Sequence, residues 1–281
     1  MLSVSIGPFA TSFDRLLPVV AVIVALTVGA LLGRRRGVAT GGTLLNLVWI
    51  GIVVARISFV LRYADEYRGD WLGVLDIRDG GFDVVSGLAA TLVAAAWILW
   101  RTPAVRKPLG AALLAGGLSW GSIAGVVTLI DTQSRAMPQV ALQTLGGTRT
   151  DLQTLSANTG QPMVINLWAT WCPPCRREMP VLEAAQQEHP DITFVFANQG
   201  EGAAQIQQFI DQFSLTLDNV VLDRGGALGR TVGSMGLPTT LFYDADGRLI
   251  NSHTGELSRA TLARGLRRFA SRGTNEGSFE D

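Results

Sequence analysis

The sequence predicts an α-helical membrane domain of four spans followed by an α/β domain. Up to about Ile130 the chain of 281 residues is dominated by apolar runs, whereas beyond Met137 its pattern is that of a soluble α/β domain. The length suits about two domains of ordinary size. We therefore expect a membrane domain over residues 1–134, an α/β domain over 135–272 and a mobile polar tail over 273–281.

Four stretches are long and apolar enough to cross a bilayer, which takes about 20 residues. They are Leu16–Leu32, Gly41–Leu61, Val84–Trp100 and Leu109–Ile130. A cleavable signal peptide carries its positive charge before the apolar run, but here the basic run Arg34–Arg36 follows it. We therefore expect the first stretch to remain as an uncleaved span.

The charges of the loops predict the orientation of these spans. Basic residues lie between spans one and two, at Arg34–Arg36, and between spans three and four, at Arg101–Lys107. The loop Arg62–Asp83 also has arginines, but six acids accompany them. Lysine and arginine mark the cytoplasmic side, and both basic loops can face it only if both chain ends face outward. We expect a multi-pass protein of the inner (cytoplasmic) membrane, embedded in the lipid bilayer, with its C-terminal domain in the periplasm.

A charged residue, Arg56, lies inside the second predicted span, where it is costly unless it is partnered. It is within about two turns of the outer end of this span. Three possibilities stay open: the side chain extends to the interface, pairs with acids of the following loop, or binds a lipid headgroup.

The segments Ala55–Leu61 and Trp71–Phe82 resemble part of prolipoprotein diacylglyceryl transferase. The resemblance extends to about Ala96. Where that family has a His-Gly-Gly motif, this chain has Val85-Ser86-Gly87. Because the histidine is absent, we expect this region to anchor the second domain and not to transfer lipid. A lipid-modifying transferase with a redox appendage is the alternative.

The chain has two cysteines, Cys172 and Cys175, three positions apart. A pair this close cannot staple a fold usefully, and both histidines of the chain are distant in sequence, which disfavours a zinc site. The continuous apolar run Pro162–Ala169 before the pair predicts a buried strand. Prolines at 173 and 174 suit the first turn of a helix. The pattern therefore places a redox pair at a helix N-terminus, with no metal or cofactor.

This spacing has a chemical reason. The free amides and dipole at a helix N-terminus stabilise a thiolate, so we expect Cys172 to be the attacking nucleophile. A second thiol one turn further on can attack the mixed disulfide and release the product, which is the role we expect for Cys175.

The remaining pattern predicts alternating strands and helices. The expected strands are Asp191–Asn198, Val220–Leu222, Thr239–Tyr243 and Leu249–His253, the last two forming a hairpin. The expected helices are Ala203–Phe213, Ala227–Gly233 and Arg259–Phe269.

The run Trp168–Pro180 and the later Gly236-Leu237-Pro238-Thr239 resemble the TlpA/ResA/CcmG branch of thioredoxin-like disulfide reductases, and the resemblance extends from about Met137 to Ala270. It implies a thioredoxin-like fold and a membrane-tethered protein-disulfide reductase. In that family the proline matching Pro238 is cis and faces the redox pair. Substrate would then pair with the Leu237 backbone and contact Trp171 and Pro173.

Thioredoxin has a buried aspartate six residues before its first cysteine, where this chain has Asn166. Glu178 matches an acid found in the cytochrome-maturation members of the family and is our candidate for the missing proton acceptor. A surface glutamate in the first turns of a helix would have the same sequence pattern.

The expected partners follow from this reading. Substrates would be exported proteins with disulfides, apocytochromes in cytochrome c maturation among them. The predicted spans contain no cysteine, so a separate membrane electron donor of the DsbD or CcdA type is expected. The zero net charge gives no indication of a nucleic-acid partner. A disulfide oxidant or isomerase, and a binding module with little turnover, are alternatives that the sequence leaves open.

Overall fold

The computed structural model describes residues 3–6, 9–69, 71–131, 136–234 and 236–276. The chain forms two compact units. A helical unit comprises Phe13–Leu75 and Gly81–Thr132, and an α/β unit comprises Met1–Ser12, Asp76–Gly80 and Gln133–Asp281.

The helical unit consists of four long helices, of which the second and third are joined by the long loop Tyr63–Asp83. The helices are α1 (Phe13–Arg34), α2 (Gly41–Arg62), α3 (Val84–Arg101) and α4 (Arg106–Asp131), and the 3₁₀ turns are η1 (Ala64–Tyr67), η2 (Gly73–Leu75) and η3 (Pro103–Val105). Among the described residues, three segments are long and apolar enough to cross a membrane: Leu17–Arg34, Gly41–Arg62 and Val84–Arg101. The fourth predicted span, Leu109–Ile130, is helical within α4, but its side chains from residue 126 onward lie outside the described set. Three candidate spans are therefore found, and a fourth stays a prediction.

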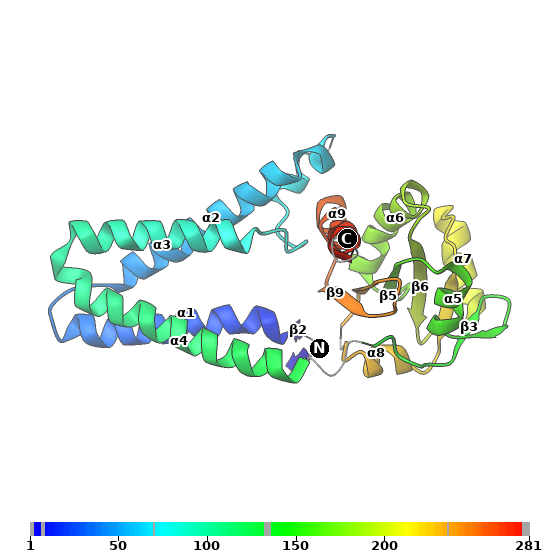
Figure 1. The fold of residues 1–281 in the computed structure, drawn as a ribbon, viewed down its shortest axis with the longest axis horizontal. Helices are drawn as coiled ribbons and strands as arrows, with labels where there is room; N and C mark the ends of the chain where they lie inside the picture. Colours follow the sequence, from blue (N-terminus) through cyan, green and yellow to red (C-terminus); the bar gives the residue numbers. More distant parts are fainter. Residues whose placement is uncertain (1–2, 7–8, 70, 132–135, 235, 277–281) are drawn as a thin grey trace. The chain divides into compact units, whose positions relative to one another are not determined.

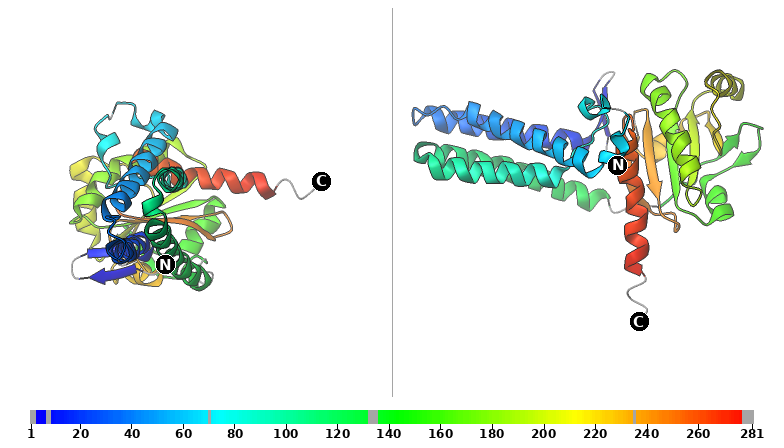
Figure 2. Two further views of the ribbon diagram at one scale, coloured as in Figure 1. Left: turned by 90° about the vertical axis from the view of Figure 1, so that its left-hand side faces the viewer. Right: turned by 90° about the horizontal axis from the view of Figure 1, so that it is seen from above.

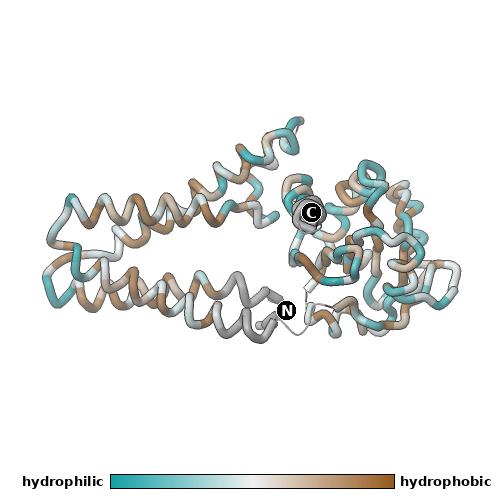
Figure 3. Tube along the Cα trace, viewed as in Figure 1, coloured by the Kyte–Doolittle hydropathy of each residue, from teal (hydrophilic) through white to brown (hydrophobic). Residues whose placement is uncertain are grey.

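These helices pack as two pairs, α1 with α4 and α2 with α3 (Figures 1 and 2). Small residues allow the close approach, as is usual between membrane helices. A Cβ atom at Gly87 of α3 would lie 2.7 Å from the carbonyl oxygen of Gly51 in α2, and one at Gly116 of α4 would lie 3.0 Å from that of Ala21 in α1. Both basic loops lie at the same end of the helices (Figure 3).

Arg56 of α2 is only 9% exposed, so its side chain does not extend to the surface of the unit. Its guanidinium donates hydrogen bonds to the carbonyl oxygens of Gly73 (2.9 Å), Val74 (3.0 Å) and Gly81 (2.8 Å). Backbone carbonyls of the following loop therefore partner the charge, which is an arrangement that the sequence analysis did not name, and its three possibilities stay predictions.

The α/β unit is built on a mixed sheet of seven strands. The strands are β3 (Leu142–Thr144), β4 (Arg149–Thr150), β5 (Met163–Trp168), β6 (Thr193–Gln199), β7 (Val220–Asp223), β8 (Thr239–Tyr243) and β9 (Leu249–Thr254), in the order β4-β3-β7-β6-β5-β8-β9. The helices are α5 (Leu152–Thr159), α6 (Pro173–Glu188), α7 (Ala203–Phe213), α8 (Ala227–Thr231) and α9 (Arg259–Glu276). Strands β5, β6 and β7 are parallel, and β8 and β9 form the expected antiparallel hairpin. A two-stranded hairpin of β1 (Ser3–Ile6) and β2 (Phe9–Ser12) is separate from this sheet.

Helices cover both faces of the sheet (Figure 1). Apolar side chains of α6, α7 and α9 form a core with one face, and those of α5 and α8 form a core with the other. Strand β5 is central and buried along its whole length, as its continuous apolar run predicted. Its alternating side chains divide between the two cores, so Asn166, Val164 and Trp168 lie on the face covered by α6.

Two features of this unit differ from the prediction. Strands β3 and β4 are missing from the prediction, because strands of two or three residues carry no readable periodicity. The short helix α5 is missing from it as well. Helix α9 continues to Glu276 beyond the predicted end at Phe269, into the expected mobile tail 273–281. Residues 277–281 of that tail lie outside the described residues.

Candidate redox site

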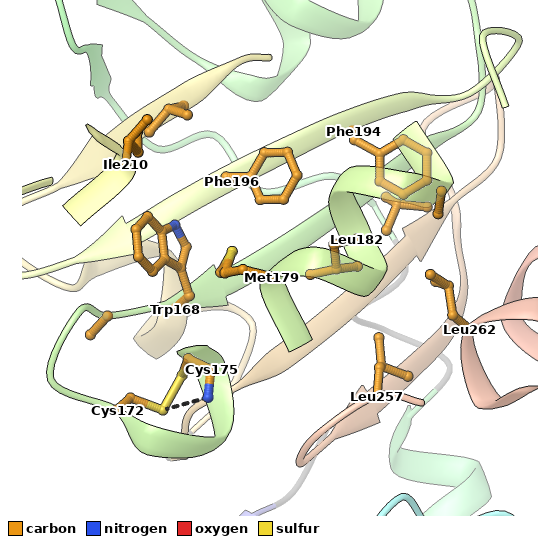
Figure 4. Close-up of a cluster of buried hydrophobic side chains, with 14 of the residues drawn as sticks. Trp168, Cys172, Cys175, Met179, Leu182, Phe194, Phe196, Ile210, Leu257 and Leu262 are labelled. Atoms are coloured by element: carbon orange, nitrogen blue, oxygen red, sulfur yellow. Dashed lines mark hydrogen bonds between the residues drawn. A yellow bond between two sulfur atoms is a disulfide. The ribbon is translucent and has the colours of Figure 1, made fainter. Parts of the chain in front are cut away.

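The two cysteines lie where the buried strand β5 leads into α6 (Figure 4). Cys172 is the N-cap of α6 and Cys175 is in its first turn, and the two form a disulfide with an S–S distance of 2.07 Å. The backbone N–H of Cys175 donates a hydrogen bond to the sulfur of Cys172 at 3.3 Å. A free helix amide thus points at the sulfur that we expect to attack, and after reduction the same amide and the helix dipole would stabilise its thiolate.

The residues beside Cys172 are exposed although both cysteines are buried. Cys172 is 3% exposed and Cys175 is fully covered, whereas the neighbouring Trp171 is 66% exposed. Pro173, on the other side of Cys172, is also exposed. The two residues next to Cys172 in the sequence are therefore exposed, and their expected contact with substrate stays a prediction.

The segment before β8 lies at the same edge of the sheet. The peptide bond between Leu237 and Pro238 is cis, as the family resemblance implied. Leu167 of β5 pairs with Thr239 of β8, so Pro238 continues the strand next to the end of β5 from which the cysteine loop departs. The carbonyl oxygen of Pro238 accepts a hydrogen bond from the N–H of Gly255 at 2.9 Å.

Glu178 is fully buried on α6, which excludes the alternative of a surface glutamate. One carboxyl oxygen accepts a hydrogen bond from the side-chain amide of Asn166 at 2.8 Å, and the other accepts one from the N–H of Leu257 at 2.9 Å. The Asn166 amide also donates to the hydroxyl of Thr240 at 3.0 Å. The residue at the position of thioredoxin's aspartate therefore contacts the acid that was proposed to replace it.

Burial raises the pKa of the Glu178 carboxyl from 4.5 to about 8. Removal from water is the largest cause, the hydrogen bonds from Leu257 and Asn166 oppose it, and the negative charge of Glu256 adds to it. Glu178 lies one helical turn after Cys175, on the same side of α6. A carboxyl with this pKa, on the same side of α6 as Cys175, can exchange protons near neutral pH.

An ion pair beside Glu178 ties α6 to the loop that covers it. The guanidinium of Arg177 contacts the carboxylate of Glu256 through two nitrogens, with Nε at 3.0 Å. Since Glu256 directly precedes Leu257, the two contacts Arg177–Glu256 and Glu178–Leu257 join the same two segments.

The sequence analysis missed a second buried acid, Glu201, which is 7% exposed. Its carboxylate accepts hydrogen bonds from both the N–H and the hydroxyl of Thr170, and also from the side-chain amides of Asn198 and Gln205. Thr170 lies two residues before Cys172, so Glu201 fixes the loop that carries Cys172. The available signal was its position just after β6, since the carboxyl ends of the adjacent parallel strands β5 and β6 meet at one edge.

Comparisons with known proteins agree with this geometry. The sequence profile of the family described as Redoxin matches residues 132–266. The thioredoxin-like protein YneN of Bacillus subtilis is 30% identical over 138 residues, which are 48% of this chain and 78% of that protein. The chain belongs to the redoxin family of thioredoxin-like proteins.

Other relatives carry an enzyme name. The thiol-disulfide oxidoreductase ResA of Bacillus thuringiensis is 27% identical over 133 residues, covering 47% of this chain and 75% of that protein. A crystal structure of a thiol:disulfide interchange protein from Chlorobium tepidum covers 49% of this chain and 97% of that chain, at 25% identity and a TM-score of 0.41. This redoxin-family chain is a thiol–disulfide oxidoreductase with a thioredoxin-like α/β domain.

Proposed function

We propose that this protein is a membrane-anchored oxidoreductase that reduces disulfides of exported proteins in the periplasm through Cys172 and Cys175. The observation that carries the proposal is the Cys172–Cys175 pair at the N-terminus of α6, with a helix amide on one sulfur and the buried Glu178 one turn beyond the other. The three apolar helices support the anchor, and the basic loops support an outward-facing redoxin domain.

The reaction begins from the dithiol. The Cys172 thiolate attacks one sulfur of the substrate disulfide, which forms a mixed disulfide and releases the other substrate sulfur as a thiolate. Cys175 then loses its proton to the carboxylate of Glu178 and attacks the Cys172 sulfur. The second substrate sulfur leaves as a thiolate and the Cys172–Cys175 disulfide remains. One substrate thiolate takes up the proton held by Glu178, and the other takes from water the equivalent of the proton that Cys172 released when it became a thiolate. The substrate therefore leaves as a dithiol that has gained two electrons. A membrane dithiol carrier of the DsbD or CcdA type would restore the reduced pair.

The docking of the substrate chain would use the exposed flank of Cys172. Trp171 and Pro173 would contact its side chains, and the backbone at Leu237 would pair with it beside the cis Pro238.

Trapping with the variant Cys175→Ser tests the roles of the two cysteines. Without the resolving thiol, mixed disulfides between Cys172 and substrates should accumulate in cells and appear on non-reducing gels. Trapping by Cys172→Ser, and not by Cys175→Ser, would reverse the assignment.

Reporter fusions test the topology. Fusions at Gly37, in the loop after α1, and after the last residue should report opposite compartments. A cytoplasmic C-terminus would separate the redoxin domain from exported substrates and refute the proposal.

A further inference from the structure

The loop between α2 and α3 exposes large apolar side chains outside the candidate spans. Trp71, Leu72 and Leu75 are 79%, 81% and 78% exposed, which is more than Trp49 within α2 at 64%. They flank and form the 3₁₀ turn η2. A loop surrounded by water rarely exposes three such side chains within five residues.

Arg56 holds this turn against α2. Its guanidinium donates to the carbonyl oxygens of Gly73 and Val74, both in η2. A third bond to the Gly81 oxygen holds the point at which the chain returns towards α3. A Cβ atom at Gly81 would lie 2.6 Å from Arg56 and 2.5 Å from the ring of Phe59, so glycine is needed there for the close approach.

This tether, the set of hydrogen bonds from Arg56, sets the depth of η2 relative to the bilayer. Arg56 lies almost two turns, or about 9 Å, before the end of α2 at Arg62. Backbone at membrane depth is tolerated only where its polar groups are paired within the protein, and the guanidinium supplies that pairing for η2. The turn therefore lies near the level at which α2 leaves the bilayer, not far out in water.

We infer that Trp71, Leu72 and Leu75 insert into the interfacial region of the outer lipid leaflet, where Arg56 holds η2 in place. This inference rests on the proposed membrane anchor. We assign lipid as the partner of these side chains because Arg56 of a candidate span binds the turn and because tryptophan and leucine suit the boundary between headgroups and acyl chains.

Site-directed quenching in lipid nanodiscs tests the inference on the full chain. The background carries Cys172→Ser and Cys175→Ser, so that a single introduced cysteine takes a fluorescent label. Leu72→Cys places the label in the turn. Arg68→Cys, whose native side chain is 82% exposed on the same loop, is the matched aqueous control. Val53→Cys, at a position on α2 that is 48% exposed, is the control for the span.

In phosphatidylcholine nanodiscs, a nitroxide on the shallow acyl carbons should quench the label at position 72, and iodide should quench it several-fold less than the label at position 68. Adding Arg56→Gln should make the label at position 72 accessible to iodide and should leave the quenching of the label at position 53 unchanged. An unchanged position 72 in that variant would refute the tether.

The remaining outcomes separate this inference from the anchor. Iodide access at position 72, with lipid quenching at position 53, would overturn the interfacial turn and leave the anchor intact. Shielding of position 72 from both quenchers would mean that protein covers the turn, which also overturns the inference. Iodide access at position 53 would refute the anchor and the inference together.

Discussion

Each of the two units buries an ionisable side chain that the sequence analysis singled out, and they do so in different ways. Glu178 of the redoxin domain is fully covered and receives two hydrogen bonds, and its pKa is raised to about 8. Arg56 of the helical unit is 9% exposed and donates to three carbonyl oxygens. A guanidinium keeps its charge in proteins, whereas a carboxyl with a raised pKa changes its charge near neutral pH. The difference indicates that the first residue is able to exchange a proton near neutral pH, whereas the second holds the loop backbone in place.

The largest effect expected from this comparison is a pH-dependent stability due to Glu178. Because its pKa is about 8 in the folded protein against an ordinary 4.5, the folded chain keeps a proton that the unfolded chain releases between these pH values. The stabilisation is fully present below the lower pKa and is lost as the pH rises to the higher one, by about 5 kcal/mol in all. Denaturant unfolding of the redoxin domain in the detergent-solubilised full chain should show this loss.

The variant Glu178→Gln should remove this pH dependence, since an amide has no proton to release in this range. Glu188→Gln, an exposed change on the same helix, is the matched control and should keep it. A wild-type stability that differs from that of Glu178→Gln by the same amount at all pH values would contradict the raised pKa.

The second effect is on the rate at which Cys175 resolves the mixed disulfide. Glu178→Gln should slow this step by about 100-fold, the lower end of what general bases contribute. In the wild type the step should accelerate as the pH rises through about 8, where the carboxyl becomes able to take a proton. Stopped-flow tryptophan fluorescence during reaction with a model disulfide measures it. An equal rate in both proteins would remove Glu178 from the catalytic role.

The sequence could predict the centre of the redox site but not its supporting contacts. The apolar run of β5 and the spacing of Cys172 and Cys175 carry their meaning locally, since they reflect a buried strand and one helical turn. Glu178 accepts a hydrogen bond from Leu257, which is 79 residues away in the sequence. Glu201, which follows β6, accepts one from Thr170, which follows the neighbouring strand β5. Local patterns do not contain such contacts.

The third effect concerns Arg56, the buried residue of the helical unit. Arg56→Gln removes at least one of the three hydrogen bonds to these carbonyls, which should destabilise the helical unit by about 1–3 kcal/mol. Unfolding in mixed micelles measures it. A helical unit that is as stable in Arg56→Gln as in the wild type would show that these hydrogen bonds do not hold the structure, against the comparison.

The smallest effect is expected from Arg177, the neighbour of Glu178. Its pair with Glu256 is partly exposed, with the two side chains at 47% and 20%, so Arg177→Gln should cost less than about 1 kcal/mol. The apparent pKa of the resolving step should stay near that of the wild type. A larger loss of stability, together with a shifted profile, would show that the ion pair maintains the burial of Glu178.

The central claim is that the Cys172–Cys175 pair works as a reductant outside the cytoplasm. The most direct measurement is the redox state of this pair in cells, by acid quenching and thiol alkylation, in the parent strain and in a strain without its DsbD- or CcdA-type carrier. We predict a reduced pair in the parent and an oxidised pair in the deletion strain. A pair that is oxidised in the parent, and becomes reduced when a DsbB-type oxidase is deleted, would show that the protein is an oxidant and contradict the account.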